Sequence, residues 1–378
     1  ASIIVEEALE KKIPAVIFDP TAQWTGFLHQ LQDKNIFKKY ATFSLREEDA
    51  KSYKGLIYTP TNENFDVEFE KYTNPGETTV FNLSNLSVKE YDKAVKNIID
   101  TIIEKKWEES PDLQLLVVFD EVHRLLDPAA EGVGYEALIK AAREFRKWGI
   151  GLIMSSQVSS DFKEAIGGNV LTEVQLNTKN IEDIKKIEEK YGAEYSDRIT
   201  RQGVGVGLVQ NPKYNKGQPW FIEFRPPFHN PHKLPEEDLA KYDSFTRKLN
   251  EIFAVIEYFK KAGINVDDYM MDYNLANNKL KEGKFRMVQI YVEDLEQSLA
   301  KESQYKKAVE NYKSQQSQAA QPSSEKNSAS NDKQVQKIKA YIEKYQKQGY
   351  SLTKLQKHLE SQNIPKHIIQ KALEEIEK

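Results

Sequence analysis

The hydrophobic residues of the first 230 positions gather in short, nearly uncharged runs that alternate with amphipathic stretches. Apolar runs of roughly 4–8 residues without polar alternation are typical of strands that are buried on both faces. The runs that predict strands are 14–19, 55–59, 78–84, 113–121, 149–157, 171–178, 205–210 and 219–227. Helical spacing is found at 2–12, 88–109, 134–148 and 180–191. This alternation predicts an α/β fold with a mainly parallel sheet flanked by helices.

The pattern changes after residue 230. Residues 235–313 have almost only helical spacing, with Gly263 and Gly283 as expected breaks. A Ser/Gln/Asn/Ala-rich stretch at 314–332 has nearly no large apolar side chain and predicts a flexible linker. Three short amphipathic helices are expected beyond it. We therefore divide the chain into a sheet-containing core (1–230), a helical accessory segment (231–313), a linker (314–332) and a small basic helical module (333–378).

Composition limits the functional classes only in part. The chain of 378 residues has 54 basic and 58 acidic side chains, so a contact with nucleic acid would need a local basic patch. There is no cysteine, which excludes disulfides, thiolate metal sites and cysteine nucleophiles. No apolar run approaches the roughly 20 residues that cross a bilayer. We expect a cytoplasmic protein.

The strand-like run "LLVVFDEVHRLLD" (115–127) ends in two neighbouring carboxylates, Asp120 and Glu121. Ligands of open α/β sheets bind at the carboxyl ends of the strands, so these acids are candidates for holding a metal ion and an attacking water. Alternatively, Asp120 caps a following helix and Glu121 is a first-turn acid that the helix dipole favours. The residues alone leave both interpretations open.

Two further segments carry polar residues at comparable places. Asp19 ends the run "VIFDP", although a turn aspartate before Pro20 is an equally simple explanation. The stretch "REFRKWGIGLIMSSQ" puts Arg143 and Arg146 just before a strand and Gln157 at its end. A solvated basic helix face and an ordinary strand-end glutamine are the alternatives for these three.

The order and spacing of these segments resemble the HerA-like branch of the FtsK/HerA superfamily of P-loop DNA-translocating ATPases. The resemblance covers about 1–230 and rests on "IPAVIFDPTAQWTGF", "LLVVFDEVHRLL", "REFRKWGIGLIMSSQ" and "VQLNTKN". It implies a RecA-like ATPase core, bound ATP and Mg²⁺, and a homo-hexameric ring around duplex DNA.

The resemblance also implies roles for six residues. Asp120 would be the magnesium-side acid, Glu121 the catalytic base that orients water, and Gln157 the sensor of the phosphate state. Arg146 would be the arginine finger that reaches a neighbouring subunit's γ-phosphate, with Arg143 as its companion. Asp19 would be the acid on the strand after the phosphate loop.

The sequence departs from this family in one respect. The phosphate-binding motif G-x-x-x-x-G-K-[ST], whose backbone N–H groups and lysine hold phosphates, occurs nowhere in the chain. Because "ASIIVEEALEKK" resembles the helix that follows this loop in the family, we expect the loop to lie upstream of Ala1. This chain by itself would then be inactive.

Four other features have plainer interpretations. We expect His123 to orient or pack rather than to bind metal, and the glycines at 203–207 to form tight turns. The basic and aromatic residues at 213–221 are expected to be an exposed hairpin tip, with contact to nucleic acid as the alternative. The tail at 333–378 resembles helical modules at the ends of archaeal proteins. It is expected to be a solvated lysine-rich surface, or a docking module for DNA, a nuclease or another protein.

The leading functional hypothesis is an ATP-hydrolysing motor that translocates DNA as a ring. A conjugation- or secretion-type motor shares the same core and is an alternative. The hypothesis from a different class is a non-hydrolysing scaffold with an ATPase fold, which the missing phosphate loop favours.

Overall fold

The computed structural model describes residues 1–65, 67–105, 107–157, 162, 164–319, 339 and 342. The chain folds into two compact units, Ala1–Ser303 and Gln304–Lys378. The second unit contains helix α11 (Tyr305–Ala319), which extends into the first part of the predicted linker. The rest of the linker, and nearly all of the predicted basic module, lie outside the described residues. The four-part division of the chain therefore stays a prediction.

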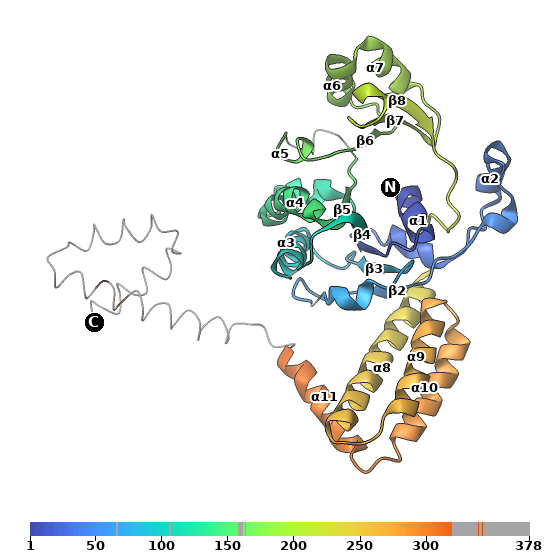
Figure 1. Ribbon diagram of the computed structural model, residues 1–378, viewed down its shortest axis with the longest axis vertical. Coiled ribbons are helices and arrows are strands. Elements are labelled where there is room, and N and C mark those ends of the chain that lie inside the picture. Colours follow the sequence, from blue (N-terminus) through green and yellow to red (C-terminus); the bar gives the residue numbers. More distant parts are fainter. Residues whose placement is uncertain are drawn as a thin grey trace. The chain divides into compact units, whose positions relative to one another are not determined.

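The first unit is built on a five-stranded sheet in which all neighbouring strands run parallel, in the order β2-β3-β1-β4-β5 (Figure 1). This confirms the predicted α/β class. The strands are β1 (Ala15–Asp19), β2 (Gly55–Tyr58), β3 (Thr78–Asn82), β4 (Ser110–Phe119) and β5 (Trp148–Met154). The helices of this region are α1 (Ser2–Glu10), α2 (Lys34–Phe37), α3 (Val88–Glu104), α4 (Val133–Glu144) and α5 (Glu164–Gly167).

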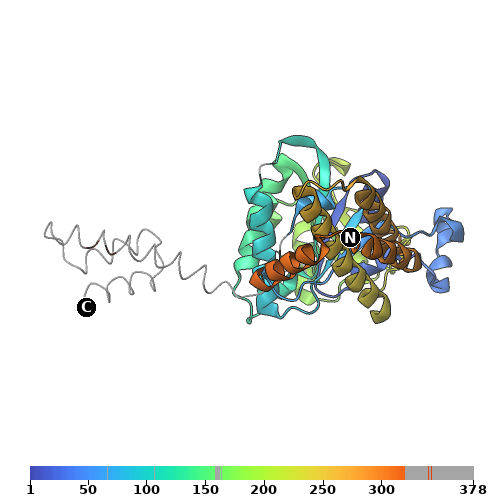
Figure 2. The ribbon, with the colours of Figure 1, turned by 90° about the horizontal axis from the view of Figure 1, so that it is seen from below.

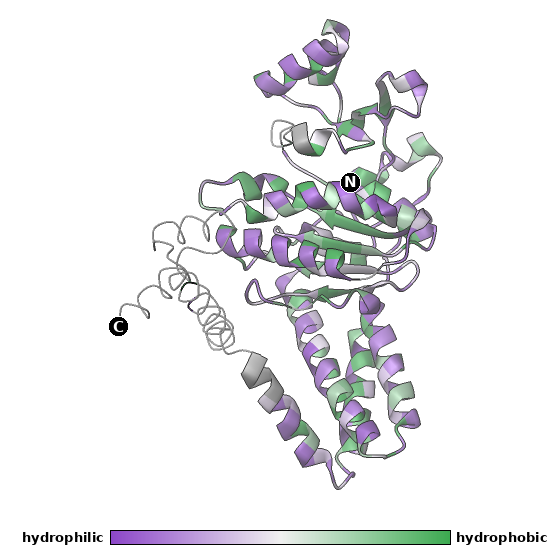
Figure 3. Cartoon of the chain, turned by 60° about the vertical axis from the view of Figure 1, so that its left-hand side comes forward, coloured by the Kyte–Doolittle hydropathy of each residue, from purple (hydrophilic) through white to green (hydrophobic). Residues whose placement is uncertain are grey.

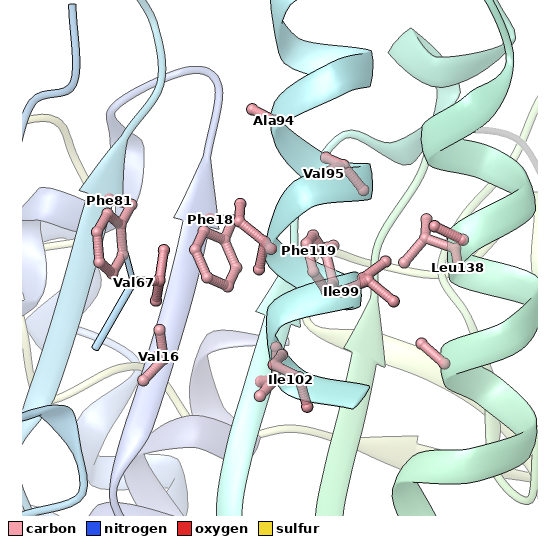
Figure 4. Close-up of a cluster of buried hydrophobic side chains, with 14 of the residues drawn as sticks. Val16, Phe18, Val67, Phe81, Ala94, Val95, Ile99, Ile102, Phe119 and Leu138 are labelled. Carbon is pink, nitrogen blue, oxygen red and sulfur yellow. The ribbon is translucent and has the colours of Figure 1, made fainter. Parts of the chain in front are cut away.

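The core of this unit lies between the sheet and helices α3 and α4, which pack side by side (Figure 1). Phe18 stacks on Phe81 at 5.1 Å and on Phe119 at 5.0 Å between ring centroids, so three neighbouring strands form one aromatic row. Helix α3 faces this row with Val95, Ile99 and Ile102, as Figure 4 shows. Figure 3 shows the same arrangement as hydrophobic strands beneath helices with hydrophilic outer faces.

Helix α3 begins where its sequence predicts. The Ser87 hydroxyl accepts a hydrogen bond from the Glu90 backbone N–H, and the Glu90 carboxylate accepts one from the Ser87 N–H. This capping box satisfies two backbone donors that a helix start leaves free. The capping box therefore fixes the residue at which the helix begins.

The last three predicted strands form a separate antiparallel sheet. Its order is β6-β7-β8, with β6 (Glu173–Gln175), β7 (Val206–Gln210) and β8 (Trp220–Glu223). Strands β7 and β8 pair antiparallel, as their short connection allows, whereas parallel strands need a longer crossover. Helices α6 (Ile181–Tyr191) and α7 (Ala193–Thr200) contact each other, and their Ile187 and Ile199 pack on Leu208 of β7.

Three long helices follow, as predicted for 235–313: α8 (Glu236–Lys261), α9 (Asp267–Lys281) and α10 (Phe285–Leu299). The breaks are at Gly263 (φ 81°) and Gly283 (φ 67°), in the left-handed region that glycine adopts without steric cost. Helices α9 and α10 run side by side in Figures 1 and 2. Helices α8 and α9 contact β2, and the ion pair Lys281–Glu77, at 2.6 Å, joins α9 to the sheet.

Among the described residues, no helix has both the length and the apolar character to span a membrane.

Candidate functional site

A row of polar residues follows the aromatic row at the carboxyl end of the parallel sheet. Phe18 pairs with Phe81 on one side and Phe119 on the other, and Phe119 pairs with Met154. The next residue of each strand lies in register with its neighbours and faces the other side of the sheet, because side chains alternate along a strand. The row therefore consists of Asn82, Asp19, Asp120 and Ser155. Strand order thus brings the two predicted aspartates together.

Asp19 is fully buried at this edge. Its carboxylate accepts hydrogen bonds from the Thr21 N–H (2.8 Å), the Thr21 hydroxyl (2.7 Å) and the Trp24 N–H (2.7 Å). Burial raises the pKa of Asp19 to about 6, the hydrogen bonds from Thr21 and Trp24 oppose this shift, and the charge of Asp120 adds to it. Asp19 does make the turn that the simple interpretation predicted, and it also lies beside Asp120.

Asp120 is held by side chains from three other segments. The Trp24 indole Nε1 donates to its Oδ2 at 2.8 Å, and the Ser155 hydroxyl donates to its Oδ1. The Tyr91 hydroxyl donates to the Asp120 backbone carbonyl at 2.9 Å. Trp24 thus contacts both aspartates, one through its backbone and one through its ring. This tryptophan fixes the two carboxylates relative to each other.

Glu121 has an unusual backbone. Its φ of 50° and ψ of 46° are in the left-handed region, which costs a non-glycine residue roughly 1–2 kcal/mol. Its carboxylate accepts a hydrogen bond from Gln157 Nε2 at 3.0 Å, and its Oε2 lies 3.0 Å from His123 Nδ1. Strained backbone of this kind persists where surrounding contacts hold it, and it is concentrated at functional sites.

The helix-capping interpretation of these acids does not hold in the structure. Glu121 occupies the N-cap position of the 3₁₀-helix η5 (Val122–Leu126), but its side chain makes no capping hydrogen bond. The Asp120 side chain is bound to Trp24 and Ser155 instead. Both carboxylates therefore belong to the cluster at the sheet edge.

Arg143 and Arg146 lie at the other end of the sheet. Arg143 is in the last turn of α4 and Arg146 is in the 3₁₀-helix η6 (Phe145–Lys147), directly before β5. An open cleft of about 490 Å³ there is lined by Glu109, Ser110, Pro111, Arg143, Arg146 and Lys147. Ser110 at the start of β4 pairs with Trp148 and Phe119 at its end pairs with Met154, so the cleft and the Asp120 edge are separated by roughly 20 Å of sheet. The two arginines cannot reach the acids of their own chain, and both are exposed, as the solvated-face interpretation predicted.

Sequence reasoning missed three residues of the cluster: Trp24, Tyr91 and Ser155. Ser155 could have been found, because it directly follows a strand that runs parallel to the one ending at Asp120. Trp24 and Tyr91 reach the site from a 3₁₀-helix, η1 (Gln23–Leu28), and from α3. No spacing in the sequence indicates that Tyr91 would meet an acid 29 residues away or that Trp24 would meet the same acid 96 residues away.

The cluster fits one part of a magnesium–nucleotide site. Among the described residues, no three His, Asp or Glu side chains lie close enough together to hold a metal ion. Mg²⁺ bound to nucleotide commonly uses only one or two carboxylates, with phosphate and water as its other ligands, so Asp120 suits that role. The phosphate cradle, by contrast, has no counterpart in the sequence, which contains no G-x-x-x-x-G-K-[ST]. The residues present therefore fit the acidic side of such a site and not its phosphate-binding side.

The N-terminal end of α1 lies near the same cluster. Ala1, directly before this helix, lies within electrostatic reach of Asp120. Positive charge and free N–H groups at a helix start attract anions. Helix α1 therefore points its electropositive end toward the acids.

No protein-family model matches the chain, and no curated protein sequence does. Among solved structures it is similar to B204, the DNA-packaging ATPase from Sulfolobus turreted icosahedral virus, at 15% identity and a TM-score of 0.29, over 56% of this chain and 96% of that one. It is similar to the bacterial conjugative coupling protein TrwB at 13% identity and a TM-score of 0.33, over 42% and 43%. A third likeness is to the pCW3 conjugation coupling protein TcpA, at 15% identity and a TM-score of 0.29, over 61% and 65%. Likenesses at this level assign neither a family nor an activity to the chain.

Proposed function

We propose that this chain belongs to an ATP-hydrolysing motor of the HerA type that moves DNA and hydrolyses MgATP at the subunit interfaces of a ring. The observation that carries the proposal is the geometry of Glu121. The backbone of Glu121 is in a strained left-handed conformation, and its carboxylate accepts a hydrogen bond from Gln157. The residue lies next to Asp120 and near Asp19 at the carboxyl edge of a parallel sheet. That edge is where open α/β sheets bind their ligands.

Glu121 is the residue that acts on water in this proposal. Its carboxylate is partly exposed, so it can accept a hydrogen bond from a water molecule and hold that water in line with the terminal phosphate. Gln157 fixes the carboxylate through its amide N–H and senses whether the phosphate is present. Asp120 would hold Mg²⁺, which supplies positive charge for the phosphate oxygens when it is bound.

Arg146 has to act on another subunit. Because roughly 20 Å of sheet separates it from the acids of its own chain, we assign its action to a neighbour's site. A contact between different surfaces of two copies closes into a ring when the rotation between them permits. An arginine delivered in this way stabilises the charge that develops on the transferred phosphate. A hexameric ring around DNA follows from the resemblance noted for residues 1–230.

A mixing experiment on the full-length gene product tests this arrangement. Arg146→Ala and Glu121→Gln should each abolish ATP turnover, whereas an equimolar mixture of the two variants should recover it. In randomly mixed rings about a quarter of interfaces join an intact Glu121 to an intact Arg146 of the next subunit. The measurement is the steady-state rate of phosphate release after subunit exchange, with duplex DNA present.

Two outcomes of that experiment contradict the proposal. If the mixture stays inactive while each variant still assembles, Arg146 does not act between subunits. If the unmodified protein releases no phosphate with or without DNA, the non-hydrolysing scaffold, which the missing phosphate loop favours, replaces the motor. The matched control repeats the experiment with Arg143→Ala in place of Arg146→Ala. It shows whether the companion arginine also acts between subunits.

A further inference from the structure

Hydrogen bonds fix the backbone of the turn between β7 and β8, residues 211–218. Three backbone hydrogen bonds close it: Tyr214 N–H to Asn211 carbonyl (3.2 Å), Gly217 N–H to Tyr214 carbonyl (2.8 Å) and Gln218 N–H to Asn215 carbonyl (3.0 Å). The Asn211 side chain accepts from the Lys213 N–H at 2.8 Å and donates to the Thr172 hydroxyl at 2.7 Å. The turn is therefore anchored to the segment that precedes β6.

Three successive residues of this turn have left-handed backbone: Asn215 (φ 47°), Lys216 (φ 56°) and Gly217 (φ 78°). Glycine accepts this conformation freely and asparagine with little cost, but lysine does not. The hydrogen bonds that close the turn on either side hold Lys216 in this conformation, so its side chain starts from a fixed position at the tip. The strained residue is Lys216.

The turn presents three exposed side chains of matching chemistry: Lys213, Tyr214 and Lys216. The Tyr214 side chain is 65% exposed, which is high for a large aromatic residue. Residues 211–222 contain no acidic side chain. At the base of the hairpin, Glu173 of β6 is already paired with Lys190 at 2.8 Å. The tip is thus a local cationic patch with an aromatic ring between its two charges.

We propose that this turn is a DNA-binding element, in which Lys213 and Lys216 contact backbone phosphates and Tyr214 stacks on an unpaired base. Lysine recognises phosphate as a point charge, and an exposed tyrosine gives a stacking surface that every base can use. The rigid backbone reduces the entropy that is lost when these side chains bind. The inference rests on the proposed function for its choice of DNA; the two lysines would contact the duplex cargo, and Tyr214 adds a contact wherever the strands are unpaired.

Fluorescence anisotropy on the full-length gene product tests this inference without nucleotide, so ATP turnover does not enter. The main variant combines Lys213→Ala with Lys216→Gly, because glycine removes the lysine and also relieves the strain at positive φ. We expect its affinity for a labelled oligonucleotide to fall at least about tenfold at low salt, and the slope of log K against log salt to fall by about 1–2. A Lys260→Ala/Lys261→Ala variant, which removes two exposed charges from the last turn of α8, is the matched control and should bind like the unmodified protein.

Tyr214→Ala separates the stacking role from the phosphate contacts. It should weaken binding to single-stranded DNA about tenfold and leave duplex binding nearly unchanged, since paired bases offer no free face. The inference is overturned if the double-lysine variant keeps the affinity and salt slope of the unmodified protein, or if the α8 control loses as much. Loss of DNA binding in a protein that hydrolyses no ATP would keep this inference and reject the motor. If the variants bind DNA normally and the unmodified protein hydrolyses ATP, this inference is rejected and the motor is kept.

Discussion

Glu121→Gln should lower ATP turnover of the full-length gene product by about 100-fold or more, while nucleotide binding stays within a factor of about two. Glutamine has the shape of glutamate, and its side-chain carbonyl can still accept the hydrogen bond from Gln157. The variant loses the negative charge that orients water and accepts its proton. The effect therefore belongs to the hydrolysis step rather than to binding, and initial rates measured beside equilibrium binding of an ATP analogue separate the two.

Glu131→Gln is the matched control for this prediction. Glu131 is an exposed glutamate in the loop before α4, where it pairs with Lys89 at 2.7 Å and lies outside the acid cluster. Its replacement should leave turnover unchanged, because an exposed ion pair contributes little. Equal turnover by the unmodified protein and Glu121→Gln would remove Glu121 from the mechanism, and an equal loss in both variants would make the effect nonspecific.

The second large effect that we expect is on stability, and it comes from a buried ion network between α1 and the segment after β8. Glu6 is fully buried, and its Oε1 accepts hydrogen bonds from the backbone N–H groups of Phe228 (2.7 Å) and His229 (3.1 Å). The same oxygen lies 2.6 Å from His229 Nδ1, and Oε2 accepts from Arg225 Nη1 at 2.5 Å. Glu6 thus joins the helix that points toward the acid cluster to the chain that leaves the antiparallel sheet.

Glu6→Ala should lower the free energy of unfolding by about 3–5 kcal/mol, because the buried donors of Phe228 and His229 lose their acceptor and Arg225 loses its buried partner. Glu7→Ala is the control: Glu7 also pairs with Arg225, at 2.7 Å, but its side chain is 55% exposed, so its loss should cost about 1 kcal/mol or less. Urea unfolding followed by circular dichroism measures both. Similar small losses for the two variants would show that the Glu6 network does not hold α1 in place.

The Glu6 network also gives a pH signature. Burial raises the pKa of Glu6, but the hydrogen bonds and charges of His229 and Arg225 outweigh it, so the net shift is downward. Burial lowers the pKa of His229. Both groups then stabilise the fold above their unfolded pKa values of 4.5 and 6.5 and lose that contribution as the pH falls. The stability difference between the unmodified protein and Glu6→Ala should therefore shrink on acidification.

Asp19 contributes with the opposite sign. Its pKa is raised to about 6 in the folded chain, mainly by burial, so its contribution is present at low pH and is lost as the pH rises through about 6. The charged carboxylate of Asp19 therefore lowers the stability of the fold at neutral pH. Such a cost is expected where carboxylates are held together for a purpose other than stability.

The sequence predicts where the strands end better than it predicts which strands lie next to each other in the sheet. Asp19 and Asp120 are each recognisable as the acid after an apolar run, which places both at the carboxyl edge of any parallel sheet. Their contact, however, requires β1 to lie between β3 and β4, and no local pattern encodes this strand order. The left-handed backbone of Glu121 cannot be recognised in the sequence either, because the backbone on each side of it is bonded to residues distant in the chain: the Asp120 carbonyl to Tyr91 and the Val122 N–H to Ser155.

The sequence does not determine which sheet each of the later strands joins. The runs that became β6, β7 and β8 have the composition of strands, and their composition does not tell whether they extend one sheet or form another. For Arg146 the sequence did contain the relevant signal, because a residue directly before a strand lies at the opposite edge from a residue directly after one. Its separation from Asp120 within one chain follows from that rule.

In the motor proposed here, the edge formed by Asp19, Asp120 and Glu121 faces the phosphates of a bound nucleotide. A crystal structure of the full-length gene product with a non-hydrolysable ATP analogue and Mg²⁺ would show whether it does. We expect the terminal phosphate beside Glu121, the metal ion on the Asp120 side, and Arg146 of an adjacent subunit directed at the same phosphate. Nucleotide bound at another edge of the sheet, with the three carboxylates facing no phosphate, would contradict the proposal.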